Sequence, residues 1–199
     1  MTKKNLNQPV NNCCLLYNEH ASGFKVKQLN RIVKMANKHG YHITPIATKY
    51  PGYIEEAINN LNTKYDYIFT MGGDGTVGEA YRGFANLQEN GLKQQAIYAH
   101  IPSGTTNDMG KNTGVFRYFP YLSLQRLLKK GTVAERDILK VNNTPIAYIA
   151  ATGIVAPVTY LIDDTDEKKD QGTLSYIKYG IKAFFQDPEL CHNILKKPY

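Results

Sequence analysis

The chain has 199 residues, enough for one domain and part of a second. Hydrophobic residues make up 42% and charged residues 21%, a balance that excludes a disordered chain and a disulfide-stapled miniprotein. No run approaches the roughly 20 apolar residues of a membrane-spanning helix, and residues 1–17 lack the apolar core of a signal peptide. The 3 cysteines include no CxxC pair, which indicates free thiols and a cytoplasmic protein.

The net charge is +7, and the positive excess lies in residues 1–133, which hold twice as many Lys and Arg as Asp and Glu. Such a surface favours anionic partners, either phosphates or anionic lipid headgroups. No Lys/Arg run of five residues and no nucleic-acid-binding motif occurs, so we expect no nucleic acid partner.

Short apolar runs alternate with amphipathic segments along the first two-thirds of the chain. Strands are expected at residues 10–17, 41–48, 67–71 and 96–101, and helices at residues 26–39, 51–61, 77–87 and 122–130. This alternation predicts an α/β fold in which helices cover both faces of a parallel sheet.

The pattern changes after Gly131. Residues 134–141 and 146–151 flank Asn142-Asn143-Thr144, which is typical of a β-hairpin. A further helix is expected at residues 174–185. We therefore predict a first domain over residues 1–131 and a β-rich second domain over residues 132–199.

Gly72-Gly73-Asp74-Gly75-Thr76 lies between a predicted strand and a predicted helix, where backbone amides can hold phosphate. Glycines allow a close approach to the anion, and Thr76 is expected to cap the helix and donate its hydroxyl to the ligand. Asp74 would repel a phosphate unless Mg²⁺ lies between them, which favours phosphoryl transfer with a nucleotide.

A dinucleotide fingerprint also matches this loop, as Gly73-x-Gly75-x-x-Gly78. However, the strand at residues 96–101 ends without an Asp or Glu that could take a ribose hydroxyl. The Walker pattern GxxxxGK[ST] is absent as well, so neither a dehydrogenase nor a P-loop kinase is expected.

A second polar loop follows the strand at residues 96–101. It reads Pro102-Ser103-Gly104-Thr105-Thr106-Asn107-Asp108 and offers hydroxyls, an amide and a second carboxylate. The carboxyl ends of parallel strands lie at one edge of a sheet, so this loop and the glycine loop are expected to lie side by side there.

In these two loops the sequence resembles the diacylglycerol kinase catalytic-domain family, the soluble bacterial lipid kinases. Residues 72–76 with Glu79 correspond to GGDGTxxE, and residues 102–108 correspond to PxGTxND. Asn18-Glu19-His20-Ala21-Ser22-Gly23 stands where the family has NPxSG, without the proline. The resemblance implies a nucleotide-binding first domain like that of phosphofructokinases and NAD kinases, followed by part of a β-rich domain.

The resemblance also implies the roles of individual residues. The implied ATP site comprises Asn18, Ser22, Thr48, Gly72, Gly73, Asp74, Gly75, Thr76, Glu79 and Thr105. Asp74 and Asp108 would be the catalytic residues that organise phosphate and metal, with Asp74 as the Mg²⁺ ligand and Glu79 as a buttress of the loop. The family's general base lies in a late motif of the second domain, which is expected beyond residue 199.

The implied function is ATP- and Mg²⁺-dependent phosphorylation of a lipid hydroxyl, with diacylglycerol converted to phosphatidic acid in phospholipid metabolism. The enzyme would visit the membrane surface as a peripheral protein. Two alternatives stay open: an NAD kinase-like enzyme, and a nucleotide-binding fragment without turnover because the base is missing. An incomplete second domain would expose a strand edge through which a homo-oligomer could form.

Two further residue types give no site of their own. The 5 histidines have no metal-ligand spacing, and His100 is the one beside the second polar loop. Cys13 and Cys14 are neighbours in a predicted strand, so their side chains are expected on opposite faces of the sheet.

Overall fold

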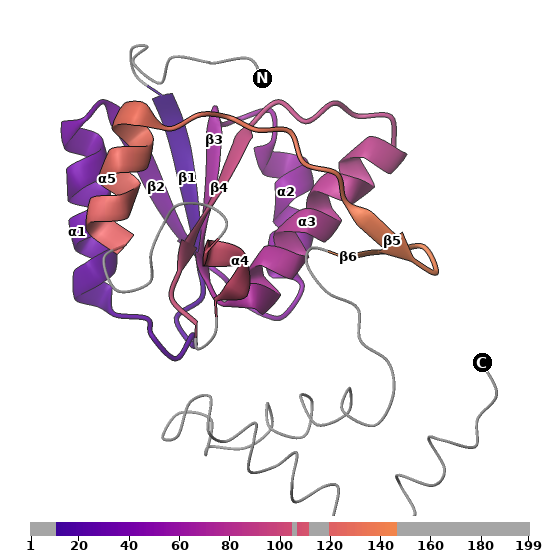
Figure 1. Cartoon of the computed structure of the whole chain (residues 1–199), viewed down its shortest axis with the longest axis horizontal. Helices are drawn as coiled ribbons and strands as arrows, with labels where there is room; N and C mark the ends of the chain where they lie inside the picture. The colour runs from indigo at the N-terminus through magenta and orange to yellow at the C-terminus, as the bar shows by residue number, and fades with distance from the viewer. Residues whose placement is uncertain (1–10, 105–106, 112–119, 147–199) are drawn as a thin grey trace, which may run out of the picture. The chain divides into compact units, whose positions relative to one another are not determined.

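A computed structural model describes residues 11–104, 107–111 and 120–146 of the chain (Figure 1). All of these residues belong to the first of the chain's two units, Met1–Tyr148. The elements in order are β1 (Asn11–Tyr17), α1 (Val26–Lys38), β2 (Tyr41–Ala47), α2 (Tyr53–Leu61), β3 (Tyr67–Gly72), α3 (Asp74–Glu89), β4 (Ile97–Pro102), α4 (Asp108–Lys111), α5 (Pro120–Lys130), β5 (Leu139–Val141) and β6 (Thr144–Ile146).

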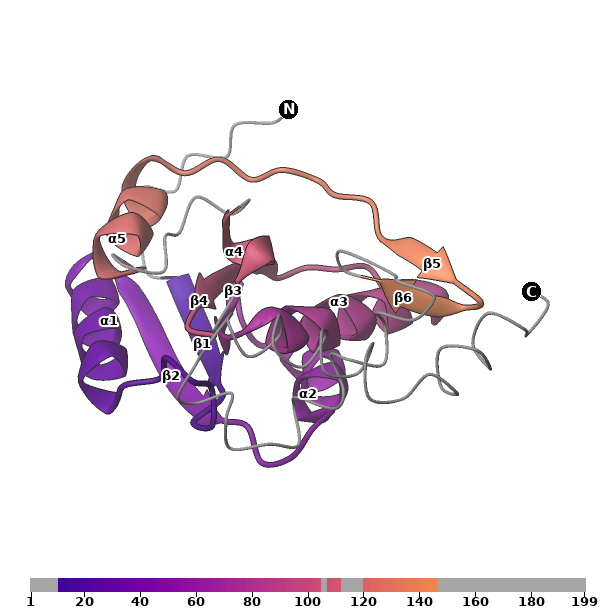
Figure 2. The same ribbon diagram turned by 60° about the horizontal axis from the view of Figure 1, so that its bottom comes forward.

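The first four strands form one parallel sheet in the order β2-β1-β3-β4. Each of the first three strands is followed by a helix that returns the chain to the start of the next strand, as parallel pairing requires. Helices α1 and α5 cover one face of the sheet, and α2 and α3 cover the other (Figures 1 and 2). The predicted α/β sandwich is therefore confirmed.

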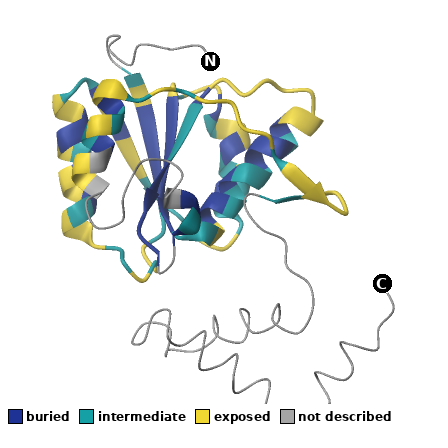
Figure 3. Ribbon diagram, viewed as in Figure 1, coloured by how far each residue is buried: buried dark blue, intermediate teal, exposed yellow. Residues whose placement is uncertain are grey.

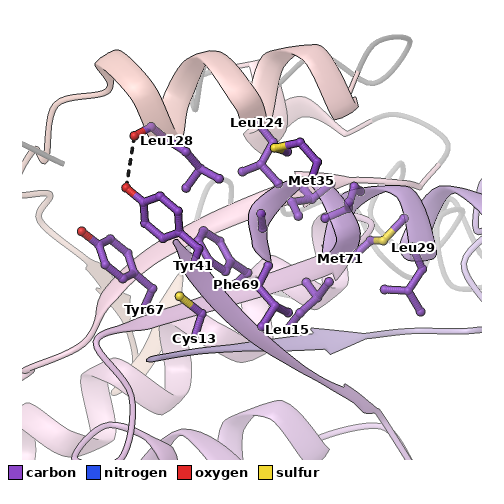
Figure 4. Packing of buried hydrophobic residues seen from close by; sticks show 14 residues of the cluster. Cys13, Leu15, Leu29, Met35, Tyr41, Tyr67, Phe69, Met71, Leu124 and Leu128 are labelled. Carbon is purple, nitrogen blue, oxygen red and sulfur yellow. Dashed lines mark hydrogen bonds between the residues drawn. The ribbon is translucent and has the colours of Figure 1, made fainter. Parts of the chain in front are cut away.

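Side chains that alternate along the strands fill two separate hydrophobic cores, and the sheet strands are largely buried in the ribbon coloured by burial (Figure 3). Cys13 and Leu15 pack under α1 and α5, whereas Cys14 and Leu16 pack under α2 and α3. This confirms that the two cysteines face opposite sides. The core under α1 and α5 also holds the last turn of α5, because the hydroxyl of Tyr41 donates to the carbonyl of Leu128 at 3.1 Å (Figure 4).

The predicted hairpin is present as the antiparallel pair β5 and β6. Its two-residue turn uses Asn142 and Asn143, both with positive φ (47° and 66°), the backbone that a type I′ turn needs. β5 is shorter than predicted, and β6 begins at Thr144 rather than at residue 146. β6 contacts α3. The expected continuation to residue 151 and the helix at residues 174–185 lie outside the described residues, and the domain boundary near Gly131 stays a prediction.

None of the helices in the described ranges is long and apolar enough to cross a bilayer.

Candidate active site

Three loops meet at the edge of the sheet where β1, β3 and β4 end. The backbone N–H of Asn18, directly after β1, donates to the carbonyl of Met71 at 3.0 Å. The N–H of Ser103, directly after β4, donates to the carbonyl of Gly72 at 2.7 Å, and the N–H of Gly23 donates to the carbonyl of Ser103 at 2.9 Å. These bonds hold together residues that the sequence placed in separate motifs.

The predicted residues outside the two main motifs lie at the same edge. Thr48 follows β2, and its N–H donates to the carbonyl of Tyr17 at 2.9 Å. The side-chain oxygen of Asn18 accepts the N–H of His20 at 2.9 Å, so in this structure it closes its own loop. Ser22 is exposed in that loop. Asn18 thus lies next to the end of β3, and Thr48 lies next to the end of β1; their contacts with ATP stay predictions.

The glycines of the site are needed for two different physical reasons. At Gly72 the side chain of Thr76 occupies the space that a Cβ would take, and at Gly104 a Cβ would overlap the Cα of Gly73. The two loops therefore touch backbone to backbone. At Gly75, in contrast, no atom lies within 4 Å of an added Cβ. The position is open, which allows a ligand to approach the backbone closely.

The glycine loop is more helical than predicted, because α3 begins at Asp74 rather than at residue 77. Gly73, with extended backbone (φ −98°, ψ −168°), occupies the N-cap position and makes no side-chain cap. The prediction that Thr76 caps the helix is wrong, since Thr76 lies inside the first turn and is buried. The amides of this turn have no partners within the helix and can bind an anion.

The two predicted acidic residues are brought to one place by α4. Oδ1 of Asp74 accepts the backbone N–H of Met109 at 3.0 Å, which places Asp108, the preceding residue, beside it. The described residues hold no group of three or more His, Cys, Asp and Glu that could enclose a metal. Mg²⁺ usually takes one or two carboxylates together with substrate phosphates. One or two carboxylates beside a helix terminus that can bind an anion fit that requirement.

Glu79 holds the neighbouring helix rather than the glycine loop. Its Oε2 accepts the backbone N–H of Ile54 at 3.2 Å. That N–H belongs to the first turn of α2, whose N-cap is Gly52 with φ 89° and no side-chain cap. Glu79 therefore supplies the missing cap and fixes α2 against α3. Contact with ATP by this residue stays a prediction.

Asn107 closes the second polar loop, a role that the predicted site residues did not include. Its Oδ1 accepts the N–H of Gly104 at 2.7 Å, and its amide donates to the carbonyl of Gly104. Its φ is 51°, the left-handed backbone that Asn tolerates better than other side chains. Thr105 and Thr106 lie outside the described residues, so the predicted ATP contact of Thr105 has no structural counterpart here.

A buried polar chain lies under the glycine loop. Oγ1 of Thr70 is 2.9 Å from the hydroxyl of Tyr98 and 2.9 Å from Nδ1 of His100. Burial lowers the pKa of His100 to about 4, although the Asp74 carboxylate acts in the opposite direction. His100 is therefore a neutral imidazole at pH 7. In the sequence, only the position of His100 just before the second polar loop indicated that these hydrogen-bonded side chains lie near the site.

Several known proteins are similar to this chain in sequence or in fold. The diacylglycerol kinase from Bacillus subtilis (strain 168) is 28% identical over 171 residues, which cover 84% of this chain and 54% of that protein. The diacylglycerol kinase from Staphylococcus epidermidis (strain ATCC 35984) is 30% identical over 168 residues, which cover 84% and 49%. A crystal structure of a diacylglycerol kinase from Bacillus anthracis matches with a TM-score of 0.56 at 28% identity, covering 68% of this chain and 45% of that one.

The chain spans about half the length of these curated relatives. The sequence profile of the diacylglycerol kinase catalytic domain matches residues 12–141, which include the four-stranded sheet except its first residue and both loops of the site. The chain therefore belongs to the diacylglycerol kinase catalytic-domain family.

Proposed function

We propose that this protein binds ATP with Mg²⁺ at the carboxyl edge of its sheet and transfers the γ-phosphoryl group to a lipid hydroxyl, with diacylglycerol as the substrate. One observation carries the proposal: the backbones of Gly73 and Gly104 touch, so the two polar loops form a single cradle beside Asp74.

The nucleotide phosphates would lie against the first turn of α3. The amides of that turn are unpaired within the helix, and the open position at Gly75 leaves room for phosphate oxygens. Asn18 and Thr48, at the ends of β1 and β2, would contact the rest of the nucleotide.

Mg²⁺ would be held by Asp74, with Asp108 beside it. The ion would supply neutralisation of the charge on the phosphate oxygens. The bond from the N–H of Met109 to Oδ1 fixes the orientation of the Asp74 carboxylate. In this family of reactions catalysis depends mainly on positioning and on electrostatic stabilisation, and a cradle fixed by backbone contacts suits that task.

A membrane-facing role is supported by the outer surface of one helical layer. The sequences of α1 and α5 contain no Asp or Glu. The two helices pack together, and their exposed cations are Lys27, Arg31, Lys34, Lys38, Arg126, Lys129 and Lys130. Each cation near an anionic membrane contributes about 1 kcal/mol of attraction. We infer that this cationic layer holds the protein, as a peripheral protein, on the bilayer that contains its substrate.

The phosphoryl transfer is tested on the full-length protein, which would include the expected general base, with labelled ATP, Mg²⁺ and a lipid panel presented in mixed vesicles. We expect label on diacylglycerol that requires Mg²⁺ and falls about 10²–10³-fold in Asp74→Asn. Label on NAD and on no lipid would contradict the proposal and favour an NAD kinase. Nucleotide binding without any transfer would support the cradle and contradict the proposed transfer.

The membrane contact is tested by co-sedimentation with vesicles rich in phosphatidylglycerol. The double change Arg31→Glu and Lys34→Glu should weaken binding by about tenfold or more, since two attractive charges become repulsive. Lys64→Glu with Lys93→Glu is the matched control, because both lysines are exposed but lie outside the cationic layer. Equal losses in the two double variants would show that net charge, rather than this layer, binds the membrane.

A further inference from the structure

Donors and acceptors in the polar chain under the glycine loop can be assigned from the chemistry of its three side chains. Burial raises the pKa of the Tyr98 phenol, so the phenol keeps its proton and needs an acceptor. Thr70 Oγ1 is 2.9 Å away and takes that role. The single hydrogen of Thr70 is then left for Nδ1 of His100, also 2.9 Å away. Because Nδ1 accepts, the proton of the neutral imidazole lies on Nε2.

This Nε2–H donor is fully buried and makes no hydrogen bond of normal geometry among the described residues, although the Gly72 backbone lies close enough to the ring to raise the pKa of His100 slightly. A buried donor of this kind is costly to leave unpaired, and native proteins rarely do so without a reason. Tyr98, at the other end of the chain, is bonded and packed against Phe84 and Tyr81 of α3. The unpaired end of the chain is the end nearer to the site.

The register of the strands indicates which residues lie near the His100 ring. Helix α3 runs opposite to β4, so moving two residues along the strand, from Tyr98 to His100, moves about one turn towards the N-terminus of the helix. On β3, Thr70 pairs with His100, and Gly72 is two residues further on, on the same face. The side chain of Thr76 lies over Gly72, where a Cβ would be. Diagonal positions of this kind are about 7–8 Å apart, within reach of a long side chain.

We propose that His100 is a positioning residue of the nucleotide site: when phosphate binds, its Nε2–H donates to Oγ1 of Thr76, so that the Thr76 hydroxyl hydrogen turns outward to a phosphate oxygen. The relay runs from Tyr98 through Thr70 and His100 to Thr76. No proton is transferred along it, and each hydroxyl simply keeps one orientation. This inference rests on the proposed function, because it needs a nucleotide phosphate at the first turn of α3.

The first test is nuclear magnetic resonance of the whole chain with ¹⁵N-labelled histidine and backbone. We expect the His100 nitrogens to show a proton on Nε2, with its resonance shifting downfield when Mg²⁺ and ATP are added. Changes in the backbone chemical shifts of Gly72 to Thr76 without any change at His100 Nε2–H would overturn the inference but not the proposed function. No shift anywhere on adding nucleotide would overturn the proposed function and the inference with it. A proton on Nδ1 instead would also overturn the inference.

The second test compares nucleotide affinity by calorimetry. His100→Leu removes both polar atoms and should weaken binding by about tenfold, whereas His100→Gln keeps an N–H near the Nε2 position and should restore most of the affinity. In the Thr76→Val background, His100→Leu should cost nothing more, because the acceptor is already gone. Equal affinities for the Leu and Gln variants, or additive losses in the double variant, would contradict the relay. The resonance measurement decides the question on the unaltered protein if a variant fails to fold.

Discussion

The two faces of the sheet bury side chains of different polarity. One face lies under α1 and α5, and the other lies under α2 and α3. Cys13, Leu15 and Phe69 are typical of the first face, which takes no buried polar residue from α1 or α5 among the described residues. The buried polar residues belong instead to α2, α3, the strands under them and the second polar loop: Asn62, Thr70, Thr76, His100, Ser103 and Asn107.

The outer surfaces of the two helical layers differ in charge. The layer of α1 and α5 presents cations and no acids. The layer of α2 and α3 carries Glu55, which binds Arg82 at 2.7 Å and Asn86 at 3.0 Å, and Glu79, which caps α2. We infer that one layer stabilises the fold and meets the membrane, whereas the other positions the nucleotide loop from beneath.

The largest expected effect is on the free energy of unfolding, and it comes from the layer of α1 and α5. Leu124 of α5 is fully buried, and Leu124→Ala should lower the free energy of unfolding by about 3 kcal/mol, since it leaves a cavity. Leu122→Ala on the same helix, 57% exposed, should change it by less than about 0.5 kcal/mol. Denaturant unfolding measures both. A fall in the nucleotide affinity of the folded Leu124→Ala protein would contradict the division of roles.

A smaller effect should come from His100 on the other face. Its folded-state pKa of about 4 lies below the usual 6.5 because burial disfavours the charged ring, so the unfolded chain binds a proton first. The stability from this group is complete above pH 6.5 and is lost as the pH falls from there towards 4. Between pH 7 and pH 5 it should lose about 2 kcal/mol.

His100→Gln should remove that part of the pH dependence while leaving the contribution of the carboxylates. Urea unfolding of the wild type and of His100→Gln at pH 7 and pH 5 measures the difference between them. The same loss of stability in both proteins would show that His100 is not the group responsible.

The last prediction concerns thiol reactivity, which should be equally low on the two faces. Burial raises the pKa of Cys13 and of Cys14 to about 12, so at pH 8 only about one thiol in 10⁴ is ionised at either site. In a Cys191→Ser protein, which leaves these two thiols alone, Ellman's reagent should react with neither until denaturant is added. Rapid reaction of one thiol would show that one helical layer opens far more readily than the other.

Much of this arrangement could be predicted from the sequence because it depends on local patterns. The alternation of apolar runs predicts the parallel sheet, and the two motifs after residues 71 and 101 meet at one edge for topological reasons. The start of α3 was missed because Gly75 has poor helix propensity, although a first-turn glycine is tolerated there. Helix α4 has 4 residues, too few for a periodic pattern.

The relay under the loop could not be predicted, because it depends on which residues pair across strands. Thr70 and His100 are 30 positions apart and become partners only through the register of β3 and β4. Each residue alone is an ordinary polar interruption of a strand. For the same reason, the Gly73–Gly104 contact and the bond between Asp74 and Met109 could not be predicted from the sequence.

The central claim, a Mg²⁺-nucleotide site at the first turn of α3, is tested most directly by calorimetric titration of Mg²⁺ and ATP into the whole chain and into Gly75→Ala. An added Cβ at Gly75 meets no protein atom within 4 Å, so the fold should be kept, and alanine favours the helix. The methyl group would stand where the phosphate must approach. We predict saturable binding to the wild type and its loss in a Gly75→Ala protein of unchanged or higher stability. Equal binding by both proteins would contradict the account.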